Sequence, residues 1–416
     1  MENQEVFDSI RKRLEKVSEF MKLSKEEVDL LLKHEKVSYA VLDVNGKNYD
    51  AWRILHSNAL GPGKGGIRFH PDVSEDEVKS LSFWMSLKTS LLGLPLGGGK
   101  GGVRFNPKEV NQEELEQISR AYVRAFSDVI GADKDIPAPD VYTNSQTMAW
   151  MLDEYEKIKN KNEPGMITGK PLELGGIALR TDSTSKGGFI VLKDFLEKVG
   201  EDSKDIKIAI QGFGNAGSYI GEMLENEGYK VVAVSDSKGG VYKEDGLDVV
   251  EISNLKKEGK SVVDYDAEKI SNSELLELGV DILILAALEN QITSENADNI
   301  KAKYILELAN GPIDSEADEI LFKKDIVVIP DILANAGGVV VSYFEWSQNK
   351  VGNILEEEFL KNKLTEYMKN AFNKVYKLYE ENKEDLSMRE AAYVFAIERI
   401  LNAERVRGNL SKRESI

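Results

Sequence analysis

The sequence predicts an α/β protein of two domains with a C-terminal helical segment. The chain has 416 residues, enough for two or three domains of about 150 residues each. From about residue 205, short apolar strands alternate with helices, a pattern typical of a parallel sheet covered on both faces. The region before it mixes a hairpin with helices. We therefore expect domains over 1–180 and 181–335, and a helical segment over 336–416 that packs back on the first domain.

Local patterns predict the elements of the first domain. Strict alternation over 37–44 and 49–56, around the two-residue turn Asn45-Gly46, predicts a β-hairpin. Ser74 and Glu77 have the spacing of a capping box and open a helix. Apolar residues at helical spacing predict further helices over 6–21, 25–33, 112–129 and 145–157.

Two glycine-rich segments, 61–66 and 97–102, carry one lysine each, Lys64 and Lys100. We expect both segments to be loops that leave the ammonium group uncrowded and expose backbone N–H groups to a ligand. Neither is a P-loop, because glycine follows each lysine where serine or threonine is required. A third lysine, Lys88, lies on an apolar helix face. Its ammonium group either faces a ligand or reaches water while the methylene groups of the side chain stay buried.

Charge and composition limit the function. The sequence has 54 Lys and Arg against 72 Asp and Glu, a net charge of −18, which argues against a binder of nucleic acid or anionic membranes. Residues 51–104 reverse this balance with seven basic and four acidic residues, which favours a small anionic substrate. With no cysteine and three histidines, we expect no metal site. Without an export signal or a membrane-spanning apolar run, we expect a cytoplasmic protein.

The second domain opens with a dinucleotide-binding pattern. A strand over 207–211 leads into Gly212, Gly214 and Gly217 in the G-x-G-x-x-G arrangement, a helix follows, and Asp236 ends the next strand. The glycines let the backbone approach a pyrophosphate at the helix N-terminus, and the acidic residue would accept hydrogen bonds from ribose hydroxyls. Further strands are expected at 230–235, 282–286, 304–307 and 326–329.

The cofactor that this pattern predicts is NAD, with NADP as the alternative. A carboxylate at Asp236 disfavours the 2′-phosphate of NADP. Ser235, Ser237 and Lys238 beside it could bind that phosphate, so the choice between the two cofactors stays open.

Lys100 and Asp140 are the candidate catalytic residues. Neighbouring cations and burial both disfavour a protonated ammonium group, so Lys100 could titrate near neutrality and act as a base. Asp140 follows the rigid segment 137–139 and could transfer protons. The alternative for Asp140 is a loop aspartate near the start of the helix expected at 145–157.

Several segments resemble the signature segments of glutamate dehydrogenases, members of the amino-acid dehydrogenase family that acts on glutamate, leucine, phenylalanine or valine. They are 61–70, 88–89, 95–102, 137–143, 212–217 and 335–342, and they occur in the family's order. The resemblance implies reversible oxidative deamination of L-glutamate to 2-oxoglutarate and ammonia with NAD or NADP. It also implies a cleft between a substrate domain and a Rossmann-like domain, and a homohexamer.

The resemblance also implies roles for individual residues. Lys64 and Ser342 match positions that bind the side-chain carboxylate of glutamate, and Lys88 matches the lysine that binds its α-carboxylate. Hydride transfer from Cα leaves an iminium; Lys100 would activate the water that attacks it, while Asp140 moves protons to and from nitrogen. The positions that match residues lining the cofactor are Thr184, Asn215 and Asn310.

Two departures from the family pattern concern the cofactor contacts. Residues 183–187 read Ser-Thr-Ser-Lys-Gly where the family has Ala-Thr-Gly-Arg-Gly, and 285–287 read Leu-Ala-Ala where it has Pro-Ala-Ala. Two other functions also stay open. A dehydrogenase of leucine, phenylalanine or valine would have an apolar residue in place of Lys64. A catalytically silent regulatory subunit of a mixed hexamer would not need Lys64, Lys88, Lys100 and Asp140 all intact.

Overall fold

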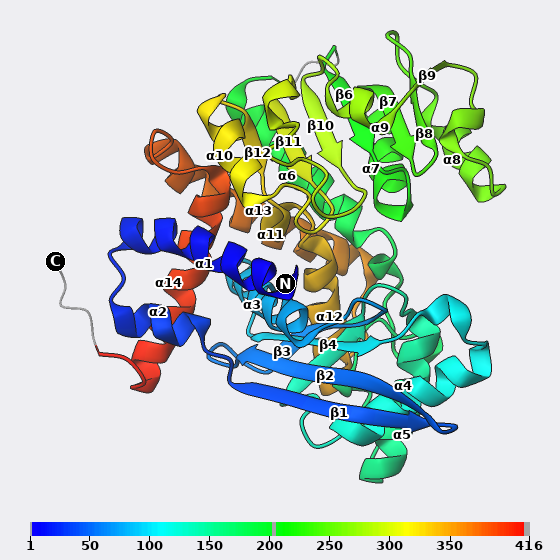
Figure 1. The fold of residues 1–416 in the computed structure, drawn as a ribbon, viewed down its shortest axis with the longest axis vertical. Coiled ribbons are helices and arrows are strands. Elements are labelled where there is room, and N and C mark those ends of the chain that lie inside the picture. The colour runs from blue at the N-terminus through cyan, green and yellow to red at the C-terminus, as the bar shows by residue number, and fades with distance from the viewer. Residues whose placement is uncertain (1, 202–204, 412–416) are drawn as a thin grey trace. The chain divides into compact units, whose positions relative to one another are not determined.

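The structure is a computed structural model that describes residues 2–201 and 205–411 (Figure 1). The chain forms two compact units. Unit 1 contains the chain up to Arg180, Val339–Lys361 and the part from Tyr393 onwards, and unit 2 contains Thr181–Gly338 and Asn362–Ala392. The predicted α/β class is confirmed, because each unit has its own sheet with helices packed on it. Residues 412–416, at the end of the expected C-terminal segment, lie outside the described part.

The sheet of unit 1 has five strands. They are β1 (Lys36–Val44), β2 (Lys47–Ser57), β3 (Gly63–His70), β4 (Gly98–Arg104) and β5 (Asp135–Pro139), in the order β1-β2-β4-β3-β5. β1 and β2 form the predicted hairpin, and Asn45 and Gly46 adopt left-handed φ angles of 54° and 77° that suit its turn. β4 is antiparallel to β2, whereas β3 runs parallel to both β4 and β5.

Helices cover both faces of this sheet. They are α1 (Glu2–Met21), α2 (Lys25–Leu32), α3 (Glu75–Leu91), α4 (Gln112–Phe126) and α5 (Ser145–Lys159), with most of α12 (Gly337–Val351) and α14 (Met388–Arg407). α3 packs on the face that carries Ile54, and α4 and α5 pack on the face that carries Ala51 and Ile67. Lys100 pairs with Ile54 across β2 and β4, so it lies on the α3 face.

The two glycine-rich segments are parts of strands, and the prediction that they form loops was wrong. Residues 63–66 begin β3, and residues 98–102 lie in β4. The two strands approach so closely that a Cβ atom on Gly65 would overlap the carbonyl oxygen of Gly99. Glycine is needed here for close packing of backbone on backbone, whereas a glycine run more often marks a turn.

The sheet of unit 2 has seven strands. They are β6 (Lys207–Gln211), β7 (Lys230–Asp236), β8 (Gly239–Tyr242), β9 (Glu268–Ile270), β10 (Ile282–Leu285), β11 (Tyr304–Glu307) and β12 (Val327–Ile329), in the order β12-β11-β10-β6-β7-β8-β9. The five strands β12, β11, β10, β6 and β7 are parallel to one another, as predicted. β8 and β9 extend the sheet antiparallel and were not predicted, because β8 begins with two glycines and β9 reads Glu-Lys-Ile, so neither has the continuous apolar run of the parallel strands.

The helices of unit 2 surround a sheet that is buried at its centre. They are α6 (Ser183–Val199), α7 (Asn215–Asn226), α8 (Val249–Lys257), α9 (Asn272–Leu276), α10 (Ser315–Lys323), α11 (Asp331–Ala334) and most of α13 (Glu357–Glu381). β10 is buried along its whole length, which explains its continuous apolar sequence. Within residues 2–201 and 205–411, no helix combines the length and the apolar character needed to cross a bilayer.

Candidate active site

The three lysines singled out by the sequence are all buried in unit 1. Lys64 lies on β3, Lys100 on the neighbouring strand β4, and Lys88 on α3, which packs on both strands; their exposed fractions are 2%, 5% and 7%. A lysine that extends its head to water would be more exposed, so the structure disfavours that alternative for Lys88. Buried ammonium groups are costly unless they meet opposite charge, which makes these three positions candidates for binding anions.

Asp140 lies directly after β5, where two cations hold its carboxylate. Lys100 Nζ donates to Oδ2, and Arg68 Nε donates to Oδ1 at 3.0 Å. The backbone N–H of Asp140 donates to Thr143 Oγ1 at 2.7 Å, and this hydroxyl donates to the carbonyl of Ile67 at 2.9 Å. The turn after β5 is thereby tied to β3, which fixes the position of the carboxylate. Asn144, not Asp140, caps α5.

Gly66 makes room for this carboxylate. A Cβ atom on Gly66 would lie 2.7 Å from the Cβ of Asp140. Lys64 and Arg68 flank Gly66 at alternate positions of β3, so all three project from the same face of the strand. One strand therefore supplies a candidate ligand-binding cation, the space for an acid and the cation that orients it.

Burial and the nearest opposite charge act against each other on both Lys100 and Asp140. Burial lowers the pKa of Lys100, and Arg68 lowers it further, while Asp140 partly offsets both. Burial raises the pKa of Asp140, but Lys100 and Arg68 outweigh it and hold this pKa below its usual value. Asp140 is therefore ionised at neutral pH and can accept a proton, and Lys100 gives up its proton more readily than a lysine in water.

Arg68 was missed by the sequence analysis, which counted it only among the basic residues of 51–104. Its guanidinium bridges Asp140 and Glu77. Glu77 was expected to complete a capping box, but only half of that box forms. Ser74 Oγ accepts from the N–H of Glu77 at 3.2 Å, whereas the Glu77 carboxylate pairs with Arg68. The available signal was the alternation of Lys64, Gly66 and Arg68 along one strand.

A second ion pair supports the glycine strands from within the sheet and was also missed. Arg53 of β2 holds Asp135 of β5, with Nε at 2.7 Å from Oδ2, and donates to the carbonyl of Gly65 at 3.1 Å. Arg53 and Asp135 are 1% and 2% exposed. A Cβ atom on Gly63 would lie 2.7 Å from Asp135 Oδ1, so the pair occupies space that glycine leaves. The pair thus connects β2, β3 and β5, and Lys64 lies on the middle one of these strands.

Both cations and carboxylates act on the ammonium group of Lys64. Burial lowers the pKa of Lys64 well below its ordinary value, and Arg180 and Arg53 lower it further, while Glu345 and Asp135 partly offset them. Ser342 on α12 is buried, one turn before Glu345. Glu345 is itself paired with Lys170 at 2.6 Å and accepts from the N–H of Gly169 at 2.9 Å. A carboxylate ligand at Lys64 would offset the local excess of positive charge.

In unit 2, the three glycines at the junction of β6 and α7 have distinct roles: Gly212 and Gly214 precede the helix, and Gly217 lies in its first turn. Gly212 has a φ of 89° and lies against the backbone of residues 286 and 287, so that a Cβ atom on it would be only 2.6 Å from these atoms. A Cβ atom on Gly217 would overlap the carbonyl oxygen of Gly212. Gly214 meets open space, immediately before Asn215 begins α7. The first and third glycines thus serve packing, and the second leaves a bare backbone at a helix N-terminus, as a pyrophosphate requires.

Asp236 ends β7, and its carboxylate already accepts several hydrogen bonds from the protein, which the sequence did not indicate. Its carboxylate accepts from Lys256 Nζ at 2.8 Å, Ser261 Oγ at 2.9 Å, the N–H of Lys238 at 2.9 Å and the N–H of Val262 at 3.0 Å. Burial raises the pKa of Asp236, but these donors lower it to about 2. The expected ribose acceptor is therefore a carboxylate whose charge Lys256 largely balances.

The other expected cofactor residues also lie in unit 2. Thr184 lies in the first turn of α6, and Asn310 lies in the loop after β11. Asn335 Nδ2 donates to Asn310 Oδ1 at 2.9 Å. The first turn of α6 packs on the start of α12, where a Cβ atom on Gly187 would lie 2.9 Å from the N atom of Gly337. The segment that departs from the family pattern is thus close-packed, although its sequence differs.

Comparison with known proteins gives a consistent result over nearly the whole chain. The model of the Glutamate/Leucine/Phenylalanine/Valine dehydrogenase family matches residues 175–408, and the model of the dimerisation domain of Glu/Leu/Phe/Val dehydrogenases matches residues 33–157. An NAD-specific glutamate dehydrogenase of Bacillus subtilis is 47% identical, over 96% of this chain and 94% of its own. An NADP-specific glutamate dehydrogenase of Synechocystis is 43% identical, over 97% of each chain.

Solved structures agree. The glutamate dehydrogenase of Peptoniphilus asaccharolyticus is 37% identical, with a TM-score of 0.84 over 98% of this chain and 100% of its own. A hetero-hexameric glutamate dehydrogenase of Thermus thermophilus is 31% identical, with a TM-score of 0.89 over 96% of this chain and 97% of its own.

Proposed function

Because this chain belongs to the glutamate, leucine, phenylalanine and valine dehydrogenase family, we propose that it catalyses the reversible, NAD(P)-dependent oxidative deamination of L-glutamate to 2-oxoglutarate and ammonia. The observation that carries the choice of glutamate is Lys64, a buried ammonium group whose pKa is lowered by burial and by two arginines more than two carboxylates raise it. An apolar substrate side chain would leave this charge without a partner, at a cost of several kcal/mol. The names of the relatives at 43–47% identity support the same substrate.

The buried lysines divide the work of substrate binding. Lys64, assisted by Ser342, binds the side-chain carboxylate, and Lys88 binds the α-carboxylate. Two fixed cations at opposite ends of a dicarboxylate orient its Cα, because both ends must be satisfied at once.

Asp140 and Lys100 move the protons. The ionised carboxylate of Asp140 accepts a proton from the substrate nitrogen, which prepares Cα to lose hydride. The nicotinamide, when bound, accepts that hydride. Lys100, with its lowered pKa, takes a proton from the water that attacks the iminium carbon, and Asp140 returns a proton to the nitrogen. As the C–N bond breaks and ammonia leaves, the freed Asp140 carboxylate accepts the proton of the new hydroxyl group, and the carbonyl forms. Arg68 keeps the Asp140 carboxylate in place during both transfers.

Gly212, Gly214, Gly217 and Asn215 support dinucleotide binding by unit 2, with Thr184 and Asn310 as further contacts. NAD is the main cofactor we propose, and NADP is the alternative. The contact between Lys256 and Asp236 favours NADP more than the sequence alone does, because the lysine balances the charge of the carboxylate. The NAD-specific and NADP-specific relatives support both. We also propose a homohexamer in the cytoplasm that binds neither nucleic acid nor membranes.

Initial rates of the purified chain test the proposal. Glutamate should be oxidised with NAD or NADP at least a hundredfold more efficiently than leucine, phenylalanine or valine, judged by kcat/KM. Efficient turnover of an apolar amino acid would identify the alternative enzyme. Binding of NADH without turnover of any of these amino acids would identify the silent regulatory subunit.

A further inference from the structure

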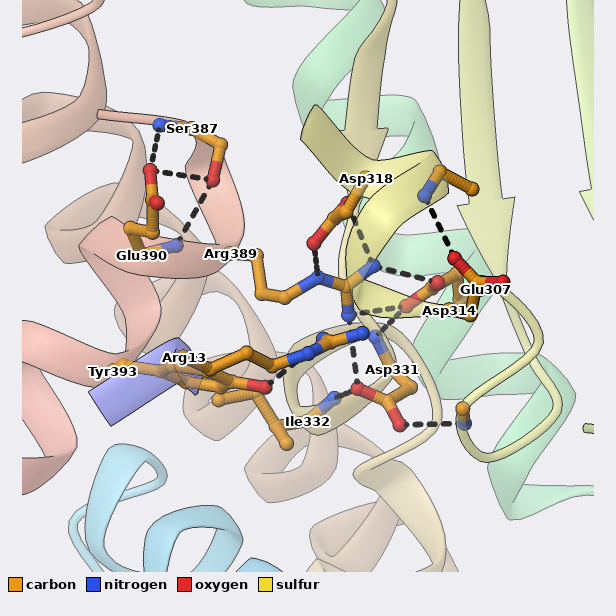
Figure 2. Close-up of polar contacts among 12 residues, drawn as sticks. Arg13, Glu307, Asp314, Asp318, Asp331, Ile332, Ser387, Arg389, Glu390 and Tyr393 are labelled. Carbon is orange, nitrogen blue, oxygen red and sulfur yellow. Dashed lines mark hydrogen bonds and ion pairs between the residues drawn. The ribbon is translucent and has the colours of Figure 1, made fainter. Parts of the chain in front are cut away.

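One buried cluster of unit 2 is not used by this mechanism. It consists of Arg389 at the start of α14 and three carboxylates, those of Glu307, Asp318 and Asp331 (Figure 2). We call it the Arg389 cluster. Its guanidinium forms a two-pronged pair with Glu307, with NH1 at 2.8 Å from Oε2 and NH2 at 2.7 Å from Oε1, and its Nε lies 2.6 Å from Asp318 Oδ2.

The side chains of Arg389 and Glu307 are 2% and 0% exposed. Burying a charged pair to this extent costs more than a packed apolar pair, so it is weak as a means of stabilisation. The planar guanidinium fork, however, fixes the direction of each carboxylate that it holds. The cluster is therefore suited to setting the geometry of the segments from which its carboxylates come.

Two of these carboxylates control one loop. Glu307 is the last residue of β11, and the loop 308–312 follows it. Glu307 Oε2 accepts from the N–H of Asp331 at 2.8 Å, which anchors the start of α11. Asp331 in turn accepts from the N–H of Gly311 through Oδ2 at 3.0 Å. The loop is thus held at its origin by Glu307 and near its end by Asp331, and both carboxylates contact Arg389.

The same short helix also holds the middle of the loop. Asn335, which caps the C-terminus of α11, donates through Nδ2 to the carbonyls of Leu308 and Ala309 at 3.3 and 3.2 Å and to Asn310 Oδ1 at 2.9 Å. The loop follows the carboxyl end of a parallel strand, the edge of such sheets where dinucleotides bind. Asn310 is the position on it that we assign to the cofactor.

We infer that Arg389 is a positioning residue for the nicotinamide cofactor, which acts through Glu307 and Asp331 to hold the loop 308–312 in its binding conformation before the cofactor arrives. The inference rests on the cofactor binding that the proposed function requires. Loss of the fork would free the loop, and each binding event would then include the cost of ordering it.

The test measures NADH affinity in the full chain, by fluorescence titration without glutamate, at least 20 °C below the midpoint of thermal unfolding. Arg389→Met should weaken NADH binding about tenfold and raise the KM for the oxidised cofactor in proportion. The KM for glutamate should change less than twofold. Arg389→Lys should restore little of the loss, because an ammonium group cannot form the two-pronged pair.

Arg399→Met is the matched control on the same helix. Arg399 donates to the carbonyls of Ser90, Gly93 and Leu94 in unit 1 and to none in the loop 308–312. Its removal should lower thermal stability but leave NADH affinity within twofold of the wild type. If the role of Arg389 were purely structural, Arg389→Met would give the same result as Arg399→Met.

A pH profile provides a readout that a structural role would not change. Burial raises the pKa of Glu307 to about 7 despite the opposing effect of Arg389, and Asp331 and Asp318, which also face it, act in the same direction as burial. Protonation of Glu307 weakens its pairing with Arg389, so NADH affinity should fall as the pH is lowered from 8 to 6. Glu307→Gln should bind NADH weakly and show a flatter profile.

The outcomes separate this inference from the proposed function. If the wild-type chain binds no NADH, the proposed function fails. If the wild type binds NADH and Arg389→Met, at native thermal stability, binds it within twofold, only the positioning role is overturned. If Arg389→Met does not fold, Arg389→Lys and Glu307→Gln decide, and wild-type affinity with an unchanged pH profile in both overturns the inference.

Discussion

Asp140 in unit 1 and Glu307 in unit 2 are both carboxylates that contact an arginine, but their surroundings differ in the number of cations. Asp140 contacts two cations, Lys100 and Arg68, and its pKa is held low although burial raises it. Glu307 shares the single guanidinium of Arg389 with two other carboxylates, and its pKa is raised to about 7. Burial raises the pKa at both sites, and the difference between the two carboxyl groups follows the ratio of cations to carboxylates around them.

This difference predicts different consequences of losing charge at the two sites. Asp140→Asn should produce the largest effect, because the ionised carboxylate is the proposed proton acceptor. We expect kcat to fall about a thousandfold. NADH affinity should stay within twofold of the wild type, in contrast to the Arg389 and Glu307 variants. A kcat within tenfold of the wild type would show that Asp140 does not transfer the proton.

Lys64→Leu should have the next largest effect and act on substrate recognition alone. Loss of the ammonium group removes the partner of the side-chain carboxylate, so kcat/KM for glutamate should fall about a hundredfold or more. Oxidation of leucine or norvaline should rise from its wild-type level, because a costly buried charge no longer faces their side chains. Unchanged discrimination between glutamate and leucine would contradict the role of Lys64.

Arg68→Met tests the electrostatic part of the comparison. Arg68 lowers the pKa of both Lys100 and Asp140, so its removal should raise both pKa values and move the pH profile of kcat/KM to higher pH. We also expect about a tenfold loss of kcat near neutrality, because Lys100 is then protonated more often and Asp140 has lost one of the groups that orient it. A shift to lower pH, or an unshifted profile, would be inconsistent with this account.

Lys256→Met should give the smallest effect, on cofactor choice. Without Lys256, the charge of Asp236 is no longer balanced and repels a 2′-phosphate. The ratio of NADPH to NADH dissociation constants should therefore rise about fivefold, with little change in the NADH value. Lys260→Met, which removes a lysine paired at 2.8 Å with Glu258 rather than with Asp236, is the control and should leave the ratio unchanged.

Much of the fold could be predicted because its signals are local. The Asn45-Gly46 turn, the apolar strands of unit 2 and the glycines between β6 and α7 each depend on neighbours within a few residues, and the structure confirms these elements. The glycine-rich strands at 63–66 and 98–102 were missed. Their glycines are required by the close contact between β3 and β4, which no local sequence pattern shows.

The same limit applies to the site. Lys64, Lys88 and Lys100 were found by their unusual local settings and by resemblance. Arg53 and Asp135 are 82 residues apart, and Arg389 and Glu307 are also 82 residues apart, so neither pair could be derived from spacing. Such pairs depend on which strands and helices meet, which only the assembled fold determines.

The absence of side chains at Gly65 and Gly66 also restricts how this architecture can change its substrate. Even a methyl group at either position would collide with a neighbouring strand or with Asp140, so these positions cannot contribute new contacts to a ligand. A change of specificity then has to come from Lys64 or from residues on other elements, such as the buried Ser342 on α12. The backbone of β3 and β4 beneath the site therefore has little freedom to change, and enzymes that share this architecture have to differ in the side chains around it.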